Sequence, residues 1–70
     1  MTLQINGKTR DLDLPATATL DQILHKLDLK ADRIAVERNG TIVARPSWPT
    51  TEVATGDRLE IVHFVGGGKN

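Results

Sequence analysis

The segment with the clearest chemical potential is the glycine run Gly66-Gly67-Gly68, which directly follows the β-prone residues 58–65. Glycine has no Cβ, so such a run can lie extended in a narrow channel, although ordering it costs more backbone entropy than ordering any other residue type. Three glycines can carry the end of the chain about 10 Å beyond the last strand. A carboxyl group on a glycine there can be approached closely by a nucleotide in one active site and by a nucleophile in another.

No set of catalytic side chains accompanies the glycines. The run opens no helix and is not followed by the Lys-Ser/Thr pair of a phosphate loop. Ser47 has no positioning motif, and Asp11 and Asp13, two apart on one strand face, are more typical of a solvated surface than of a paired-carboxylate site. We expect His25 to be exposed and His63 to be a partly buried structural residue rather than a partner contact. The expected protein is therefore not an enzyme.

Composition excludes several other classes. The 70 residues make one small domain, which buries only about 60% of its unfolded surface. There is no cysteine and there are two histidines, so we expect no disulfide, no metal site and no bound cofactor. Nine basic and nine acidic residues cancel, which argues against nucleic acid as a partner. No apolar run approaches the ~20 residues of a membrane span, and the first residues lack signal-peptide features. The expected location is the cytoplasm.

The elements that must position the glycines follow from periodicity and turn chemistry. Asn-Gly pairs at 6–7 and 39–40 predict two tight hairpins, with strands near 3–5, 8–14, 34–38 and 41–44. Thr19 and Gln22 fit a capping box, and apolar residues at helical spacing predict a helix over 19–28. Two prolines predict that 45–49 is irregular, and the last strand covers 58–65. Trp48 should hold this crossover loop over one edge of the core.

This order of strands and a single helix predicts a two-layer α+β domain, with one helix packed on a sheet of four or five strands. We assign residues 1–65 to the domain and residues 66–70 to a flexible glycine-rich tail. Along the last strand, Leu59 and Ile61 should face the helix, whereas Val62 and Phe64 should face away from it. Two interpretations of Val62 and Phe64 stay open: they contact a partner, or the loop carrying Trp48 folds over them.

At this point the chain resembles the ThiS family, the sulfur carrier proteins of thiamin biosynthesis with a ubiquitin-like β-grasp fold. The resemblance covers the whole chain. It is carried by both Asn-Gly hairpins, the Trp48 loop, the Gly-Asp-x-aliphatic strand that begins at Gly56, and the terminal glycines. The combination is far more specific than either hairpin alone.

The resemblance implies a carrier with a C-terminal thiocarboxylate. In such proteins an activating enzyme uses ATP to adenylate the terminal glycine, a cysteine desulfurase-type protein supplies sulfur, and the thiocarboxylate donates it to thiazole synthase. Carried onto this sequence, the working carbonyl is that of Gly68, with Gly66 and Gly67 as its tether, and Val62 and Phe64 as partner contacts. The lack of cysteine is consistent with sulfur carried on the backbone.

Lys69-Asn70 departs from the family pattern, because family members work with a free terminal glycine. We expect a peptidase to remove these two residues before activation; the alternative is that they were added for expression. Two other functions share the predicted fold. One is a sibling sulfur carrier, such as the small subunit of molybdopterin synthase or a carrier of cysteine biosynthesis, and the other is a ubiquitin-like protein modifier.

Overall fold

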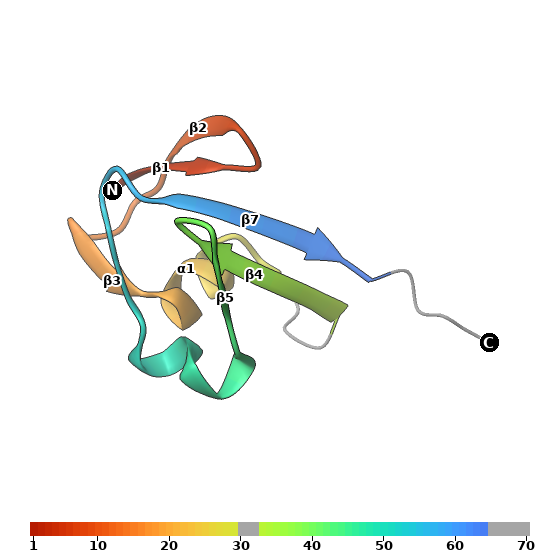
Figure 1. Ribbon diagram of the computed structural model, residues 1–70. Coiled ribbons are helices and arrows are strands. Elements are labelled where there is room, and N and C mark those ends of the chain that lie inside the picture. Colours follow the sequence, from red (N-terminus) through yellow and green to blue (C-terminus); the bar gives the residue numbers. More distant parts are fainter. Residues whose placement is uncertain (30–32, 65–70) are drawn as a thin grey trace.

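The computed structural model describes residues 1–29 and 33–64, which form a five-stranded sheet with one α-helix packed on one face (Figure 1). The strands lie in the order β2-β1-β7-β4-β5. A separate two-stranded sheet pairs β3 with β6. The elements are β1 (Thr2–Ile5), β2 (Lys8–Asp11), β3 (Thr17–Thr19), α1 (Leu20–Lys26), β4 (Ile34–Arg38), β5 (Thr41–Val43), the 3-10 helix η2 (Arg45–Thr50), β6 (Glu52–Ala54) and β7 (Arg58–His63). The predicted α+β class is confirmed.

Both predicted hairpins are present. The β1–β2 turn has φ values of 51° at Asn6 and 80° at Gly7, and the β4–β5 turn has 50° at Asn39 and 87° at Gly40. Positive φ at both central positions is the turn geometry that matches the twist of the flanking strands, and Asn-Gly adopts it readily. The second strand of the first hairpin ends at Asp11, three residues earlier than predicted.

Strand β7 lies in the centre of the sheet, although it comes last in the sequence. It pairs parallel with β1 through Gln4↔Arg58 and Ile5↔Leu59. It pairs antiparallel with β4 over five residue pairs, the last of which is Ile34↔His63. The sheet is therefore mixed, and the last described residue, Phe64, directly follows its central strand.

Helix α1 begins with the predicted capping box. The Gln22 backbone N–H donates to the Thr19 hydroxyl at 3.2 Å, and the Thr19 N–H donates to the Gln22 side chain at 2.9 Å. The helix ends at Lys26, two residues before the predicted end. Its buried face joins the inner face of the sheet in one core, formed by Leu3, Ile5, Ala18, Leu20, Ile23, Leu24, Ile34, Val36, Trp48, Val53, Leu59 and Ile61. None of the helices within residues 1–29 and 33–64 is long and apolar enough to cross a membrane.

The crossover between β5 and β7 is more regular than predicted. Residues 45–50 form a 3-10 helix, so the expectation of an irregular segment is wrong. Pro46 lies in its first turn, where the missing N–H has no intrahelical acceptor to lose. Trp48 is 3% exposed and its indole N–H donates to the Val43 carbonyl oxygen at 2.9 Å, so the predicted role of Trp48 in holding the loop on the core is confirmed.

Strands β3 and β6 were not predicted. Each has three residues, and the pairs Thr17↔Ala54 and Thr19↔Glu52 join segments far apart in the sequence. Such short strands carry no measurable alternation of their own. Their pairing ties the entrance of α1 to the segment that leads into β7.

Candidate docking surface and carrier tail

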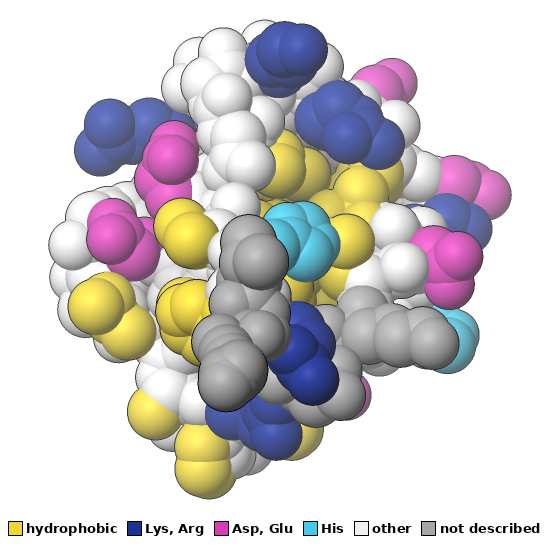
Figure 2. Space-filling view, turned by 90° about the vertical axis from the view of Figure 1, so that its right-hand side faces the viewer, with side chains coloured by type: hydrophobic (Ala, Val, Ile, Leu, Met, Phe, Trp, Pro, Cys, Tyr) yellow, Lys and Arg dark blue, Asp and Glu magenta, His cyan; other side chains and the backbone are white. Residues whose placement is uncertain are grey.

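The predicted chemical site falls outside the described residues. Gly66, Gly67, Gly68 and Lys69-Asn70 all lie in the range 65–70, as does the predicted domain boundary after Val65. The structure does describe the strand that precedes these residues in the sequence. This strand, β7, ends at His63, and Phe64 is the last described residue. Figure 2 looks onto this end of the molecule and shows hydrophobic side chains exposed around the point where the described chain stops.

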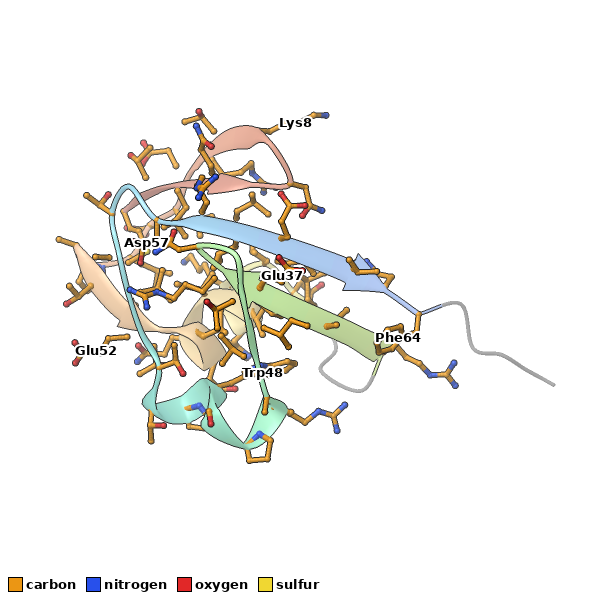
Figure 3. All side chains as sticks on the ribbon, in the orientation of Figure 1. Lys8, Glu37, Trp48, Glu52, Asp57 and Phe64 are labelled. Carbon is orange, nitrogen blue, oxygen red and sulfur yellow. The ribbon has the colours of Figure 1, made fainter. Side chains whose placement is uncertain are left out.

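The outer face of the sheet, on the side opposite α1, carries exposed apolar side chains. Val62 is 55% exposed, Phe64 57% and Ile42, on the outer strand β5, 71%. The predicted orientation of Val62 and Phe64 away from the helix is confirmed. Figure 3 shows Phe64 at the end of the β4–β7 pair, whereas Trp48 lies between β5 and η2. The alternative in which the Trp48 loop covers these residues is therefore wrong.

Two carboxylates lie beside this apolar group. Glu37 of β4 is directly opposite Glu60 of β7, and Ile42 is opposite Glu37 on the other side. Like charges directly opposite one another destabilise a strand pair. A shallow hollow between the two Asn-Gly turns is lined by both carboxylates and by Arg58. We define the outer face by Ile42, Val62 and Phe64 together with these charged residues.

The side chain of Asn6 holds β7 by acting as an additional peptide group. Its Nδ2 donates to the Ile61 carbonyl oxygen at 3.1 Å, and its Oδ1 accepts from the Ile61 N–H at 2.7 Å. The backbone N–H of Asn6 also donates to the Leu59 carbonyl oxygen at 2.9 Å. The parallel ladder between β1 and β7 is thereby extended by one step past the end of β1.

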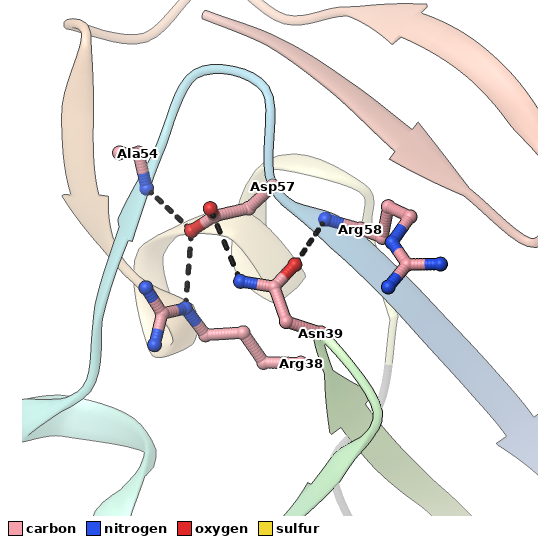
Figure 4. A network of polar contacts seen from close by, with 5 residues as sticks. All are labelled: Arg38, Asn39, Ala54, Asp57 and Arg58. Atoms are coloured by element: carbon pink, nitrogen blue, oxygen red, sulfur yellow. Dashed lines mark hydrogen bonds and ion pairs between the residues drawn. The ribbon is translucent and has the colours of Figure 1, made fainter.

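The first residues of β7 are held by a polar network around Asp57 (Figure 4). The Asp57 carboxylate accepts from the Ala54 N–H at 2.9 Å, from Arg38 Nε at 3.0 Å and from Asn39 Nδ2 at 3.3 Å. The Asn39 side-chain oxygen in turn accepts from the Arg58 N–H at 2.9 Å. Burial by itself would raise the pKa of Asp57, but these donors and the Arg38 charge outweigh it and hold that pKa below the ordinary value.

Sequence reasoning missed both Asn6 and Asp57. From the sequence, the Asn-Gly pairs predict only turns, and Gly56-Asp57 marks only the start of the Gly-Asp-x-aliphatic motif. An asparagine or aspartate in a turn can bond to backbone groups with its side chain, and this property was the signal available. The partners themselves, Ile61 and Ala54, are defined only by the tertiary arrangement.

The remaining candidate side chains are on the surface. His25 is exposed, as predicted. His63 is also exposed, so the prediction of a partly buried structural role is wrong. The reason is that α1 ends at Lys26, and His63 lies at the edge of the inner face, where it lines an open hollow with the half-buried Leu27 and Leu29. Asp11 and Asp13 are exposed, and within the described part of the chain no three His, Cys, Asp or Glu residues could together hold a metal ion.

The fold and the position of the chain end define a class of protein: a small β-grasp domain whose central strand leads directly into a glycine run. The structure is similar to the crystal structure of the thiamine biosynthesis protein ThiS from Geobacter metallireducens, with a TM-score of 0.85 and 33% identity. That match covers 97% of this chain and 100% of the other.

The model of the ThiS family matches residues 3–68. The chain therefore belongs to the ThiS family, the sulfur carrier proteins of thiamin biosynthesis. It is 38% identical over 66 residues to the sulfur carrier protein ThiS of Bacillus subtilis, covering 94% of this chain and 98% of that protein.

A second group of relatives is much longer. The chain is 41% identical over 70 residues to a thiazole synthase of Paramagnetospirillum magneticum and 33% identical to one of Magnetococcus marinus. All of this chain is matched in both cases, but it spans only 21% of each relative.

Proposed function

We propose that this chain carries sulfur as a thiocarboxylate on the carbonyl carbon of Gly68 and donates it to thiazole synthase. The observation that supports this most is the continuity between the family match, which extends to residue 68, and the end of the central strand, where Val62 and Phe64 are exposed. A domain of this kind presents its chain end, and not a pocket, to other proteins.

The chemistry requires two steps on the same carboxyl group. A carboxylate is a poor electrophile, so an activating enzyme transfers AMP from ATP to the Gly68 carboxylate and releases pyrophosphate. The outer sulfur of a persulfide on a cysteine desulfurase-type donor then attacks the acyl carbon and AMP leaves. A thiol reduces the resulting acyl disulfide, which frees the thiocarboxylate on Gly68 and returns the donor as its thiol. The chain has no cysteine, so it can hold sulfur only on its backbone.

Adenylation requires a free carboxylate, and in this sequence the Gly68 carboxyl is in a peptide bond to Lys69. The bond between Gly68 and Lys69 must therefore be hydrolysed before activation. The absence of Cβ atoms at Gly66, Gly67 and Gly68 is what lets the freed carboxyl enter a narrow active site.

The names of the longer relatives support thiazole synthase as the acceptor. In the proteins from Paramagnetospirillum magneticum and Magnetococcus marinus, a segment similar to this chain is part of a polypeptide named thiazole synthase. A carrier and its acceptor that act in successive steps gain local concentration from such a fusion.

Val62 and Phe64 are proposed as the contacts that dock the carrier on its partners. Both are more than half exposed, and both lie within a few residues of the glycines. Exposed apolar residues that adjoin one another are typical of protein interaction sites. Their position brings a partner next to the group that reacts.

Intact-mass analysis tests the proposal. The full chain, a form ending at Gly68 and a form ending at Gly67 are each incubated with the activating enzyme, ATP and a sulfur source. We expect only the form ending at Gly68 to gain the mass difference between sulfur and oxygen. Loading of the full chain without cleavage, or of the form ending at Gly67, would contradict the assignment of Gly68.

The thiamin pathway is tested in cells. Deletion of the gene should produce a thiamin requirement that the thiazole moiety alone satisfies. A molybdenum-enzyme defect would instead indicate a sibling carrier, and isopeptide conjugates to other proteins would indicate a modifier.

A further inference from the structure

The backbone groups of β7 point alternately to its two neighbouring strands. Arg58 and Phe64 bond toward β4: Asn39 N–H donates to the Arg58 carbonyl oxygen, and Phe64 N–H donates to the Arg33 carbonyl oxygen, both at 2.8 Å. Leu59 and Ile61 bond in the opposite direction, to the backbone and the side chain of Asn6. Even-numbered residues of β7 thus pair with β4, and odd-numbered residues face β1.

The next odd-numbered residue is His63, and no strand within residues 1–29 and 33–64 lies beside it on the β1 side. Strand β1 ends at Ile5, and the turn at Asn6-Gly7 reverses the chain away from β7. Within residues 1–29 and 33–64, no group bonds to the backbone N–H or C=O of His63 on that side. Figure 1 shows β7 running on past the turn of the β1–β2 hairpin. Among the residues that the structure describes, the central strand therefore has an open edge beside His63.

We propose that this open edge of β7 binds an extended segment of the activating enzyme, which pairs with the N–H and C=O of His63. This inference rests on the proposed function. An exposed strand edge is a template for another strand, and addition of a peptide to a sheet edge is a common mode of protein recognition. The added strand would continue the line of β1, at the place where the side chain of Asn6 makes the last bonds.

The surroundings of His63 fit a strand in that place. A Cβ built on Gly7 meets nothing within 4 Å, so the space at the hairpin turn is open. A hollow of about 190 Å³ lies along the edge, lined by Ile5, Asn6, Arg10, Leu27, Leu29, Ile61 and His63. Alternate side chains of an added strand point to one face of a sheet. One of them would therefore occupy this hollow, whose lining is about half polar and half apolar, and this would give the contact specificity.

We assign the activating enzyme as the partner that binds this strand edge, because adenylation requires the end of the chain to be aligned accurately. The Gly68 carboxylate must be held in line with the α-phosphate of ATP, and misplacement by about 1 Å can cost a hundredfold in rate. The glycines have no side chains by which a partner could align them. Two backbone hydrogen bonds at His63 would fix the direction in which the chain leaves the domain.

Amide hydrogen exchange measured by NMR on the ¹⁵N-labelled chain tests the contact. In the free protein, the His63 amide should exchange fast while the Val62 and Phe64 amides, which face β4, are protected. Adding the activating enzyme should slow exchange at His63 at least about tenfold. Unchanged exchange at His63 in the complex would overturn the proposal, and so would protection that thiazole synthase alone produces.

A pair of variants isolates the single N–H. His63→Pro removes the donor, which is tolerated because this N–H makes no bond to β4 and proline is found at open strand edges. His63→Ala removes the imidazole and keeps the donor. We expect His63→Ala to bind the activating enzyme about tenfold more tightly than His63→Pro, as one lost hydrogen bond predicts. Equal affinities would overturn the proposal.

Circular dichroism and thermal unfolding establish whether His63→Pro is folded. If it is not, an amide-to-ester replacement at residue 63 in a semisynthetic chain removes the same donor without changing the side chain. The proposed function fails separately: its failure would appear as no thiocarboxylate on the unmodified chain ending at Gly68. Normal loading of that chain and of His63→Pro alike would overturn only the strand-edge contact.

Discussion

The two ends of β7 are held in different ways, although they belong to one strand of six residues. The first half of β7 lies between β1 and β4, and its residue Leu59 is 0% exposed. The hydrogen bonds around Asp57 hold the start of the strand. Among the described residues, the second half has strand β4 on one side and, on the other, the side chain of Asn6 bonded to Ile61. Val62 and Phe64 are more than half exposed. Stability is concentrated where the strand begins and the proposed recognition where it ends, so mutations at the two ends should have separable effects.

The largest effect on stability is expected in the first half. Leu59→Ala should lower the free energy of unfolding by about 2–5 kcal/mol, because it removes a fully buried side chain and leaves a cavity. Urea unfolding followed by circular dichroism measures the change. Val62→Ala, on the exposed face of the same strand, is the matched control and should change stability by less than about 0.5 kcal/mol. A similar loss for both variants would contradict the difference between the two halves.

Asp57 should be next in effect. Asp57→Asn weakens three accepted hydrogen bonds in the network, and we expect a loss of about 1–3 kcal/mol at neutral pH. The pKa of Asp57 is lowered in the folded state. Its contribution is therefore present above the pKa of the unfolded chain and is lost as the pH falls through the folded-state pKa.

The measurement is a set of urea midpoints from neutral to acid pH for the wild type and Asp57→Asn. The difference between the two should shrink as the pH falls. A constant difference over the whole range would show that the carboxylate charge does not contribute, and that the substitution acts only through packing.

A smaller effect is expected at the junction of the two halves. Asn6→Gly keeps a residue that accepts the positive φ of 51° and removes both side-chain bonds to Ile61. The loss should be about 1–2 kcal/mol. Amide exchange at Ile61 should accelerate more than that at Val62, whose backbone faces β4. Equal acceleration at both amides would mean that Asn6 supports the whole domain and not this side of β7.

The smallest effect on stability, and the largest on function, is expected at the end of β7. Phe64→Asp should change the free energy of unfolding by less than about 0.5 kcal/mol, because the side chain is 57% exposed. It should nevertheless weaken binding to the activating enzyme or to thiazole synthase, as calorimetry would show. Ile42→Asp, on the same face but two strands away, maps the extent of the docking surface. Unfolding of Phe64→Asp would place Phe64 in the core and remove the distinction.

Local features of this fold were predictable from the sequence, whereas long-range ones were not. Both hairpins follow from Asn-Gly turns, and α1 follows from the Thr19 capping box, because each depends on residues close in sequence. The orientation of Val62 and Phe64 follows from the two-residue period of a strand. Strands β3 and β6 depend on pairing between residues about 35 positions apart, such as Thr17 and Ala54, so no local pattern revealed them.

The site divides in the same manner. The proposed carrier site follows from the glycines alone, and it stays a prediction because residues 66–68 lie outside the described part of the chain. The exposure of His63 was not predictable, because alternation placed it on the inner face and only the short length of α1 leaves that end of the face uncovered. The bonds of Asn6 to Ile61 likewise required knowledge that the last strand lies beside the first.

The two Asn-Gly turns have a consequence for the chemical ageing of the molecule. Asn-Gly is prone to deamidation, in which the glycine nitrogen attacks the asparagine side-chain carbonyl and a cyclic imide forms with loss of ammonia. In the folded chain, the amide of Asn6 is bonded at both ends to Ile61, and that of Asn39 is bonded to Asp57 and Arg58. Cyclisation must break these bonds, so unfolding exposes both sites to damage that would introduce a negative charge beside β7. The shelf life of this protein is thereby coupled to its folding stability.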